Sequence, residues 1–148
     1  MEESVTRNQE LAHYLHRAVF LIDRTAERAL KQQAGLTLSQ FLFLLSLDKT
    51  AGVPVSQQTI ADHLGINKAA ISRQVARLRQ KGWFVRGPHA TSRREYALSL
   101  SEEGLSKLRQ AQSVMRQTMT PHYRAAGPEV IRSLRAMCES LEKTMERQ

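Results

Sequence analysis

Basic side chains are concentrated in one segment of this 148-residue chain. Between Gly65 and Glu95 there are eight lysines and arginines and one acid, a net charge of +7, while the rest of the chain carries +1. A local excess of positive charge attracts phosphate, so it points to a nucleic acid as the partner. The alternative is a basic helix face that is only solvated.

The side chains in this segment that suit base recognition fall on one predicted helix, from Lys68 to Lys81. Ile71, Val75 and Leu78 are spaced by four and three, which gives that helix one buried face. Its opposite face can enter the major groove of DNA, where Arg73 suits a guanine edge and Gln74 an adenine edge. The predicted contacts of this helix and its cap are Asn67, Lys68, Ser72, Arg73, Gln74 and Arg77.

A shorter helix is predicted just before it, from Gln57 to His63. Ser56 can cap that helix, and Asn67 can cap the next one, because their side chains accept hydrogen bonds from first-turn amides. Gly65 permits the left-handed backbone of a sharp turn between the two helices. Ser56, Gln57 and Thr59 can donate to DNA phosphates. Two short helices joined in this way indicate a helix-turn-helix.

After Gly82 the sequence changes to a strand pattern. One predicted strand covers residues 83–85, and the alternation of residues 96–100 predicts a second strand with Tyr96, Leu98 and Leu100 on the buried face. The polar segment His89–Arg94 reads as the hairpin tip, where Arg93 and Arg94 can reach phosphates or an adjacent minor groove. Trp83 is expected to be a core residue rather than a platform for base stacking. These features predict a winged helix-turn-helix from about Leu36 to Leu100.

Long helices flank the predicted winged domain. One runs from about Asn8 to Gln33, one begins at Ser101 and is kinked or ended by Pro121, and the last begins at Gly127-Pro128. Apolar residues recur at spacings of three and four in the outer helices, as in a coiled coil. A small domain cannot cover both stripes, so we expect a homodimer; packing of the helices on each other within one chain is the alternative. The dimerisation residues are Leu11, Leu15, Ile131, Leu134, Cys138, Leu141 and Met145.

The expected fold is therefore mainly α with a small β-hairpin, in three parts. Residues 1–35 form an N-terminal dimerisation helix, residues 36–100 the winged helix-turn-helix, and residues 101–148 the C-terminal dimerisation helices. The polar N-terminal sequence lacks the features of a signal peptide, and no apolar run is long enough to cross a membrane, which favours a cytoplasmic protein.

Few other residues could carry chemistry. Cys138 is expected to be a buried structural thiol, with a redox sensor as the alternative. His13 and His16, three apart on one helix, could bind zinc together with His122, although scattered histidines are more often structural. The sequence contains no P-loop, Rossmann glycine pattern or nucleophile elbow, so we expect no enzyme and no cofactor.

Three stretches of the chain resemble the MarR family of bacterial transcriptional regulators: LTLSQFLFLL, SQQTIADHLGINKAAISRQVARLRQKGWFVR and SRREYALSLSEEG. The resemblance implies a homodimer that binds a pseudo-palindromic operator in double-stranded DNA. It also implies repression that a small molecule or oxidation relieves. Where the wing of the family commonly has two aspartates, this chain has His89 and Ser92, which makes its wing more positive.

The function expected from the sequence is that of a ligand-responsive repressor. The effector would bind between the dimerisation helices and the winged domain, where His16, Arg17 and Phe20 are candidate contacts by location. The alternatives are an architectural DNA binder with little sequence preference, a winged domain used for protein contacts, and a metal or thiol sensor on the same scaffold.

Overall fold

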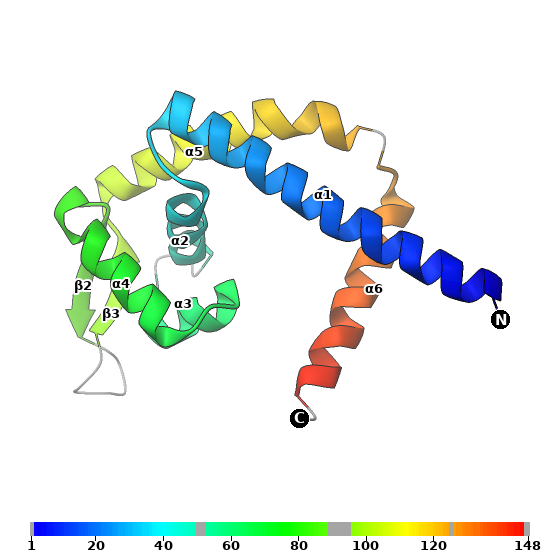
Figure 1. Cartoon of the computed structure of the whole chain (residues 1–148). Helices are drawn as coiled ribbons and strands as arrows, with labels where there is room; N and C mark the ends of the chain where they lie inside the picture. The colour runs from blue at the N-terminus through cyan, green and yellow to red at the C-terminus, as the bar shows by residue number, and fades with distance from the viewer. Residues whose placement is uncertain (1, 50–52, 89–95, 125, 147–148) are drawn as a thin grey trace. The chain divides into compact units, whose positions relative to one another are not determined.

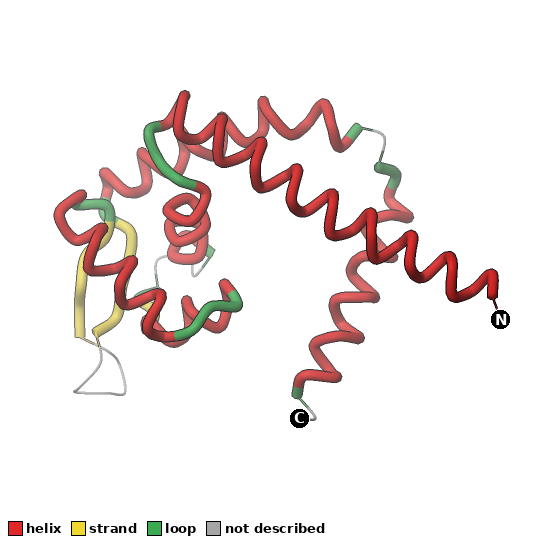
Figure 2. The backbone as a smooth tube through the Cα atoms, viewed as in Figure 1, coloured by secondary structure: helices red, strands yellow, loops and turns green. Residues whose placement is uncertain are grey.

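The computed structural model describes residues 2–49, 53–88, 96–124 and 126–146. The chain divides into two compact units, Met1–Thr118 and Met119–Gln148. Helices predominate, with a small sheet in the first unit (Figures 1 and 2). The elements are α1 (Glu2–Ala34), α2 (Leu38–Asp48), β1 (Val55–Ser56), α3 (Gln57–Leu64), α4 (Lys68–Leu78), the 3-10 turn η1 (Arg79–Lys81), β2 (Phe84–Pro88), β3 (Tyr96–Leu100), α5 (Glu102–Tyr123) and α6 (Pro128–Met145).

The sheet has three antiparallel strands in the order β1-β3-β2. The predicted hairpin is confirmed as β2 and β3, which pair from Phe84 opposite Leu100 to Pro88 opposite Tyr96. The third strand was not predicted. β1 is only two residues long, with Val55 opposite Leu98, and so short a segment shows no alternation that a sequence pattern could reveal.

The predicted alternation in β3 is wrong at its first residue. Tyr96 is exposed, whereas both Ala97 and Leu98 are buried. The reason is that β3 is the middle strand, so that Ala97 is covered at its pairing with Ser56 of β1. Tyr96 instead packs beside Arg86, whose guanidinium carbon lies 5.3 Å from the centre of the ring.

The core of the first unit gathers around α2, which contributes Phe41, Phe43, Leu44 and Leu47. Only the last turns of α1 join it, and the exposed hydrophobic side chains of that helix lie between Val5 and Leu21. α1 is also longer than the predicted Asn8–Gln33. Trp83 is 5% exposed and belongs to the core, as expected.

The first turn of α5 packs tightly against the start of the wing. Ser101 caps the helix by accepting from the Gly104 amide at 3.0 Å, as the sequence predicts, and its hydroxyl donates to the Gly82 carbonyl at 2.5 Å. Its own amide donates to the Trp83 carbonyl at 3.2 Å. One turn further on, Lys107 donates to the carbonyl of Ala34 at the end of α1, 2.9 Å away. α5 is thus bonded both to the wing and to α1.

The second unit contains the end of α5 and all of α6. α5 continues to Tyr123, two residues beyond Pro121, because a proline in the last turn interrupts few helical hydrogen bonds. Pro128 lies in the first turn of α6 after Gly127, as predicted.

Cys138 is exposed, so the expectation of a buried thiol is wrong for the single chain: none of the described residues of α6 is buried. In the described part of the chain, no helix has the length and apolar character needed to cross a membrane.

Candidate nucleic-acid interface

The turn between α3 and α4 is built from the residues that the sequence predicted. Ser56 caps α3 by accepting from the Thr59 amide at 3.0 Å, and Asn67 caps α4 by accepting from the Ala70 amide at 2.8 Å. Between the helices, Gly65 has φ 65°, a left-handed conformation that costs glycine little. The two caps and the glycine hold the start of α4 in one orientation.

Ser56 is itself buried, and its hydroxyl also lies 2.9 Å from the hydroxyl of Thr59. The structure therefore gives Ser56 a capping role. Gln57 is half-buried at the start of α3, and Thr59 is exposed one turn later. Of the three side chains predicted to contact phosphate here, Gln57 and Thr59 are accessible and Ser56 is not.

α4 has the predicted buried face. Ile71, Val75 and Leu78 are at most 1% exposed, which anchors the helix along its length. Lys68, Ser72, Arg73 and Arg77 are all exposed, as base or phosphate contacts must be. No acidic residue occurs between Gly65 and Pro88, so the positive charge of the lysines and arginines in this segment is not neutralised from within it.

Gln74 differs from its neighbours on α4. Its amide nitrogen donates to the carbonyl of Ser39 in α2 at 2.8 Å, and its oxygen accepts from the Ser39 hydroxyl at 3.2 Å. Each end of the amide predicted to recognise adenine therefore already makes one hydrogen bond within the protein. In this structure Gln74 joins α4 to α2, and these bonds orient its amide toward Ser39, leaving one N–H and one lone pair of the amide for other contacts.

A hollow of about 440 Å³ lies between the start of α2 and the side of α4. Arg73 and Arg77 line it from α4, and Thr37 and Ser39 line it from α2. The two guanidinium groups suit a phosphate of the DNA backbone, since arginine binds phosphate through paired donors. The sequence reasoning missed Thr37 and Ser39.

The signal that could have found the start of α2 is a capping box, Thr37-x-x-Gln40. Thr37 accepts from the Gln40 amide at 3.1 Å, and the Gln40 side chain accepts from the Thr37 amide at 3.0 Å. The carboxylate of Glu27 in α1 accepts from the Lys31 amine at 2.8 Å and from the Leu38 amide, and these two bonds hold the pKa of Glu27 below its usual value.

The base of the wing carries two further cations over aromatic rings. The amine of Lys81 lies 4.9 Å from the centre of the Trp83 ring, and Arg86 stands over Tyr96. Arg93 and Arg94, together with the rest of the predicted hairpin tip, lie outside the described residues.

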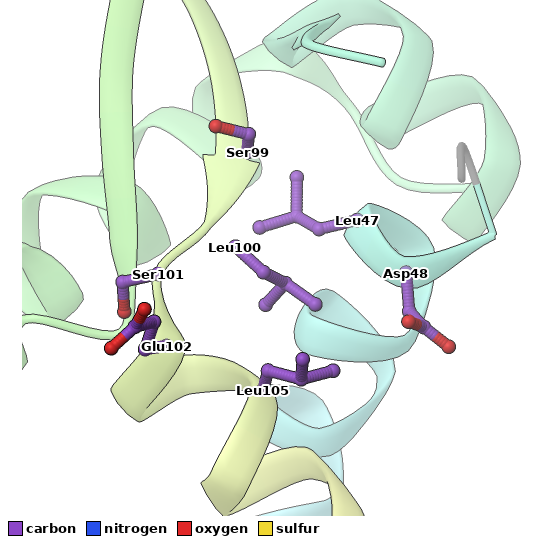
Figure 3. A pocket seen from close by; sticks show the side chains of 7 residues that line it. All are labelled: Leu47, Asp48, Ser99, Leu100, Ser101, Glu102 and Leu105. Atoms are coloured by element: carbon purple, nitrogen blue, oxygen red, sulfur yellow. The ribbon is translucent and has the colours of Figure 1, made fainter. Parts of the chain in front are cut away.

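A second hollow, of about 320 Å³, lies between the end of α2, the end of β3 and the start of α5 (Figure 3). The side chains of Leu47, Leu100 and Leu105 lie together there, with the carboxylates of Asp48 and Glu102 on opposite sides of them. Carboxylates repel phosphate, so this hollow does not suit a phosphate of the DNA backbone. Its size is near the lower limit of about 300 Å³ for small-molecule sites.

Of the three residues predicted to contact an effector, only Phe20 lines a hollow of the described structure. Phe20 lines a hollow of about 360 Å³ on α1 together with Arg24 and Arg28. The guanidinium carbon of Arg24 lies 6.0 Å from the centre of the Phe20 ring. His16 and Arg17 are exposed on the same helix but do not line this hollow.

His13 and His16 lie on α1 in the first unit, whereas His122 lies near the end of α5 in the second. Within the described ranges, no three histidine, cysteine, aspartate or glutamate side chains are grouped closely enough to hold a metal ion.

Comparison with known proteins points to one family. Residues 34–95 match the model of the MarR family. A putative transcriptional regulatory protein for the hcr operon of Thauera aromatica is 30% identical to this chain over 109 residues. The alignment covers 73% of this chain and 64% of that protein, so the chain spans less than the relative's full length. From residue 34 to residue 95, the chain is thus similar to the MarR family.

Solved structures of MarR-family proteins have the same fold. AbsC, a MarR family transcriptional regulator from Streptomyces coelicolor, superposes with a TM-score of 0.81 at 22% identity, covering 95% of this chain and 96% of AbsC. The transcriptional repressor CouR, bound to a 23-mer DNA duplex, superposes with a TM-score of 0.74 at 25% identity. That superposition covers 89% of this chain and 92% of CouR. The winged-helix fold of this chain is thereby confirmed.

Proposed function

We propose that this chain is a DNA-binding transcriptional regulator that recognises a specific operator through α4. One observation carries the proposal: α4 is anchored by a fully buried face, is capped by Asn67, and exposes Lys68, Arg73 and Arg77 on its polar sides. A rigid helix with outward cations is what the major groove and its flanking phosphates accept. The structure of CouR on a DNA duplex supports this use of the fold.

The regulator acts as a homodimer in this proposal. α6 exposes a stripe of large apolar side chains, which are costly to leave in water. They are Val130, Ile131, Leu134, Leu141 and Met145. Leu11 and Tyr14 of α1 are exposed as well, and Leu15 is half-buried. A second copy of the chain presents the same stripes, and a two-fold dimer buries like against like.

The dimer can be tested through Leu141, which is 58% exposed. Leu141→Asp should convert a dimer to a monomer in sedimentation equilibrium, because the carboxylate would lose its hydration in the interface. Ser140→Asp, a matched change on the adjacent exposed residue, should leave the dimer intact. A monomeric wild-type protein, or a dimer unaffected by Leu141→Asp, would contradict this part of the proposal.

Two-fold symmetry of the protein requires near-palindromic DNA. Each copy of α4 then reads one half-site, with centres about 34–36 Å apart, which is one turn of the duplex. Repression, relieved by a small aromatic or anionic effector, completes the proposal. The hollow on α1 supports that class of ligand, because Phe20 offers a ring face while Arg24 and Arg28 offer positive charge.

The first test is selection of bound fragments from sheared host genomic DNA by the purified protein, followed by sequencing. Near-palindromic sites with half-sites about 10–10.5 base pairs apart are expected. Affinity for the selected site should exceed that for random DNA by about 10³-fold or more. Fragments bound without a shared site would replace the regulator with an architectural DNA binder. No retention at low salt would exclude DNA binding altogether.

Arg73→Ala separates base reading from phosphate contact. If Arg73 reads a base, the variant should lose about 1–3 kcal/mol on the selected site and tolerate any base at one position of each half-site. An equal loss on all sequences would make Arg73 a phosphate contact, as its place beside the hollow with Arg77 also permits. Arg79→Ala is the control, since Arg79 lies beyond α4 in η1.

A further inference from the structure

Two alanines lie in line on the side of α4 that points away from the core. Successive residues turn by about 100° around a helix, so Ala69 and Ala76, seven residues apart, fall on one line, with Ser72 on one side of it and Arg73 on the other. Ala69, Ala76 and Arg73 are all exposed. Along the helix axis, Arg73 therefore lies between two bare methyl groups, and Arg77 follows it one turn later on the neighbouring line.

The longer polar side chains of α4 lie to the sides of this alanine face, meaning the exposed methyl groups of Ala69 and Ala76. Lys68 and Ser72 fall on one flank. Arg73 and Arg77 fall on the other, where both line the hollow shared with α2. Gln74 lies on that flank too, and both of its amide ends are bound to Ser39. The helix can therefore come closest to base edges along the alanine face.

Only one base-pair edge in the major groove offers an apolar group, the 5-methyl group of thymine, and alanine is among the side chains that contact it. We infer that the alanine face of α4 reads thymine methyl groups in the operator, on either side of the base pair that Arg73 faces. This inference rests on the proposed function. It assigns sequence selectivity to two residues whose side chains form no hydrogen bonds.

The spacing of the two alanines sets the spacing of their targets. Seven residues advance about 10.5 Å along a helix. Base pairs repeat about every 3.4 Å along one strand. Where α4 lies along the groove, the two thymines are thus about three base-pair steps apart in each half-site, with the pair that Arg73 faces between them.

Deoxyuridine tests this inference directly, because it differs from thymidine by only that methyl group. Each thymine of the genomically selected duplex is replaced in turn by deoxyuridine, and the dissociation constant of the full-length protein is measured at fixed salt. At one or two positions per half-site, loss of the buried methyl contact should weaken binding about fourfold. At the other positions the replacement should have no effect.

Variants of the two alanines identify the contact. Ala69→Gly and Ala76→Gly remove the methyl group on the protein side. The fourfold effect of deoxyuridine at a given position should therefore disappear in one of them. Ala69→Ser and Ala76→Ser keep the β-carbon and cost less helix stability than glycine, so each should reduce the deoxyuridine effect less than the matching glycine variant does. Ser106→Ala, an exposed change in α5, serves as the control.

The outcomes are distinguishable. Coupling between a thymine methyl group and either alanine supports the inference. Equal affinity for the thymidine and deoxyuridine duplexes, or a deoxyuridine effect that neither alanine variant alters, overturns it while the regulator proposal stands. A protein that retains no duplex at all overturns both.

Discussion

Gly104 lies where α5 approaches the wing too closely for any side chain. A Cβ atom built on Gly104 would stand 1.8 Å from the Trp83 carbonyl oxygen and 2.7 Å from its carbon. The obstacle is backbone, so no side-chain rotation can relieve it. Gly104→Ala must push the first turn of α5 away from the start of β2.

The magnitude follows from three opposing contributions. Alanine favours a helix over glycine by at most about 1 kcal/mol. Separating the two segments breaks the bonds from Ser101 to the Gly82 and Trp83 carbonyls, each worth about 1 kcal/mol. Forcing atoms into a packed contact costs about 1–3 kcal/mol more. Gly104→Ala should therefore lower the free energy of unfolding by about 2–4 kcal/mol.

Urea unfolding followed by far-UV circular dichroism measures this loss, with the protein concentration held fixed because a dimer's stability depends on it. The matched control is Gly87→Ala in β2, where an added Cβ meets no heavy atom within 4 Å. That variant should stay within about 0.5 kcal/mol of wild type. If Gly104→Ala were as stable as wild type, the tight junction between α5 and the wing would not exist.

Three further changes test other contacts. Lys31 and the Leu38 amide lower the pKa of Glu27, so its ionised carboxylate stabilises the fold at neutral pH, and this stability is lost as the pH falls below the ordinary value of 4.5. Glu27→Gln should therefore unfold at a lower temperature than wild type at pH 7, and the difference should narrow on acidification. A difference in stability that does not change with pH would rule out ionisation as the cause. Asn67→Ala should lower the free energy of unfolding by about 1 kcal/mol by removing the α4 cap, while Asn67→Asp should retain the cap. Equal losses of stability in the two variants, measured by urea unfolding, would mean that the side chain does not cap α4. Gln74→Ala should destabilise the fold by about 1 kcal/mol through its lost bonds to Ser39 and leave the base preference of selected DNA unchanged; a changed preference would restore Gln74 as a base reader.

Local features of the site were predictable because they depend on residues close together in the sequence. The two helix caps, the left-handed glycine between the helices and the buried face of α4 each involve residues within a few positions of one another. The same holds for the capping box at Thr37, a readable signal that the predictions overlooked. Short-range hydrogen bonds and helical periodicity are encoded in the order of the residues.

Tertiary structure alone decided the contacts that span long stretches of chain. Gln74 is bound to Ser39, 35 residues away, and nothing near Gln74 in the sequence marks it as occupied. β1 pairs with β3 across 41 to 43 residues of chain, and Ala97 is buried where it pairs with Ser56. The burial of Cys138 was predicted from the apolar pattern of its helix. Such a pattern shows that one helix face is apolar, but it does not show which other part of the structure packs against that face.

The sequence by itself determined the element types, the turn and the charge that make this chain a winged-helix protein with a basic face. The structure decided which polar side chains of that face remain available to DNA, and it left Arg73 between two alanines while engaging Gln74. The physical reason is that availability depends on partners brought together by folding, and hydrogen-bond partners distant in the chain leave no periodic trace in the sequence.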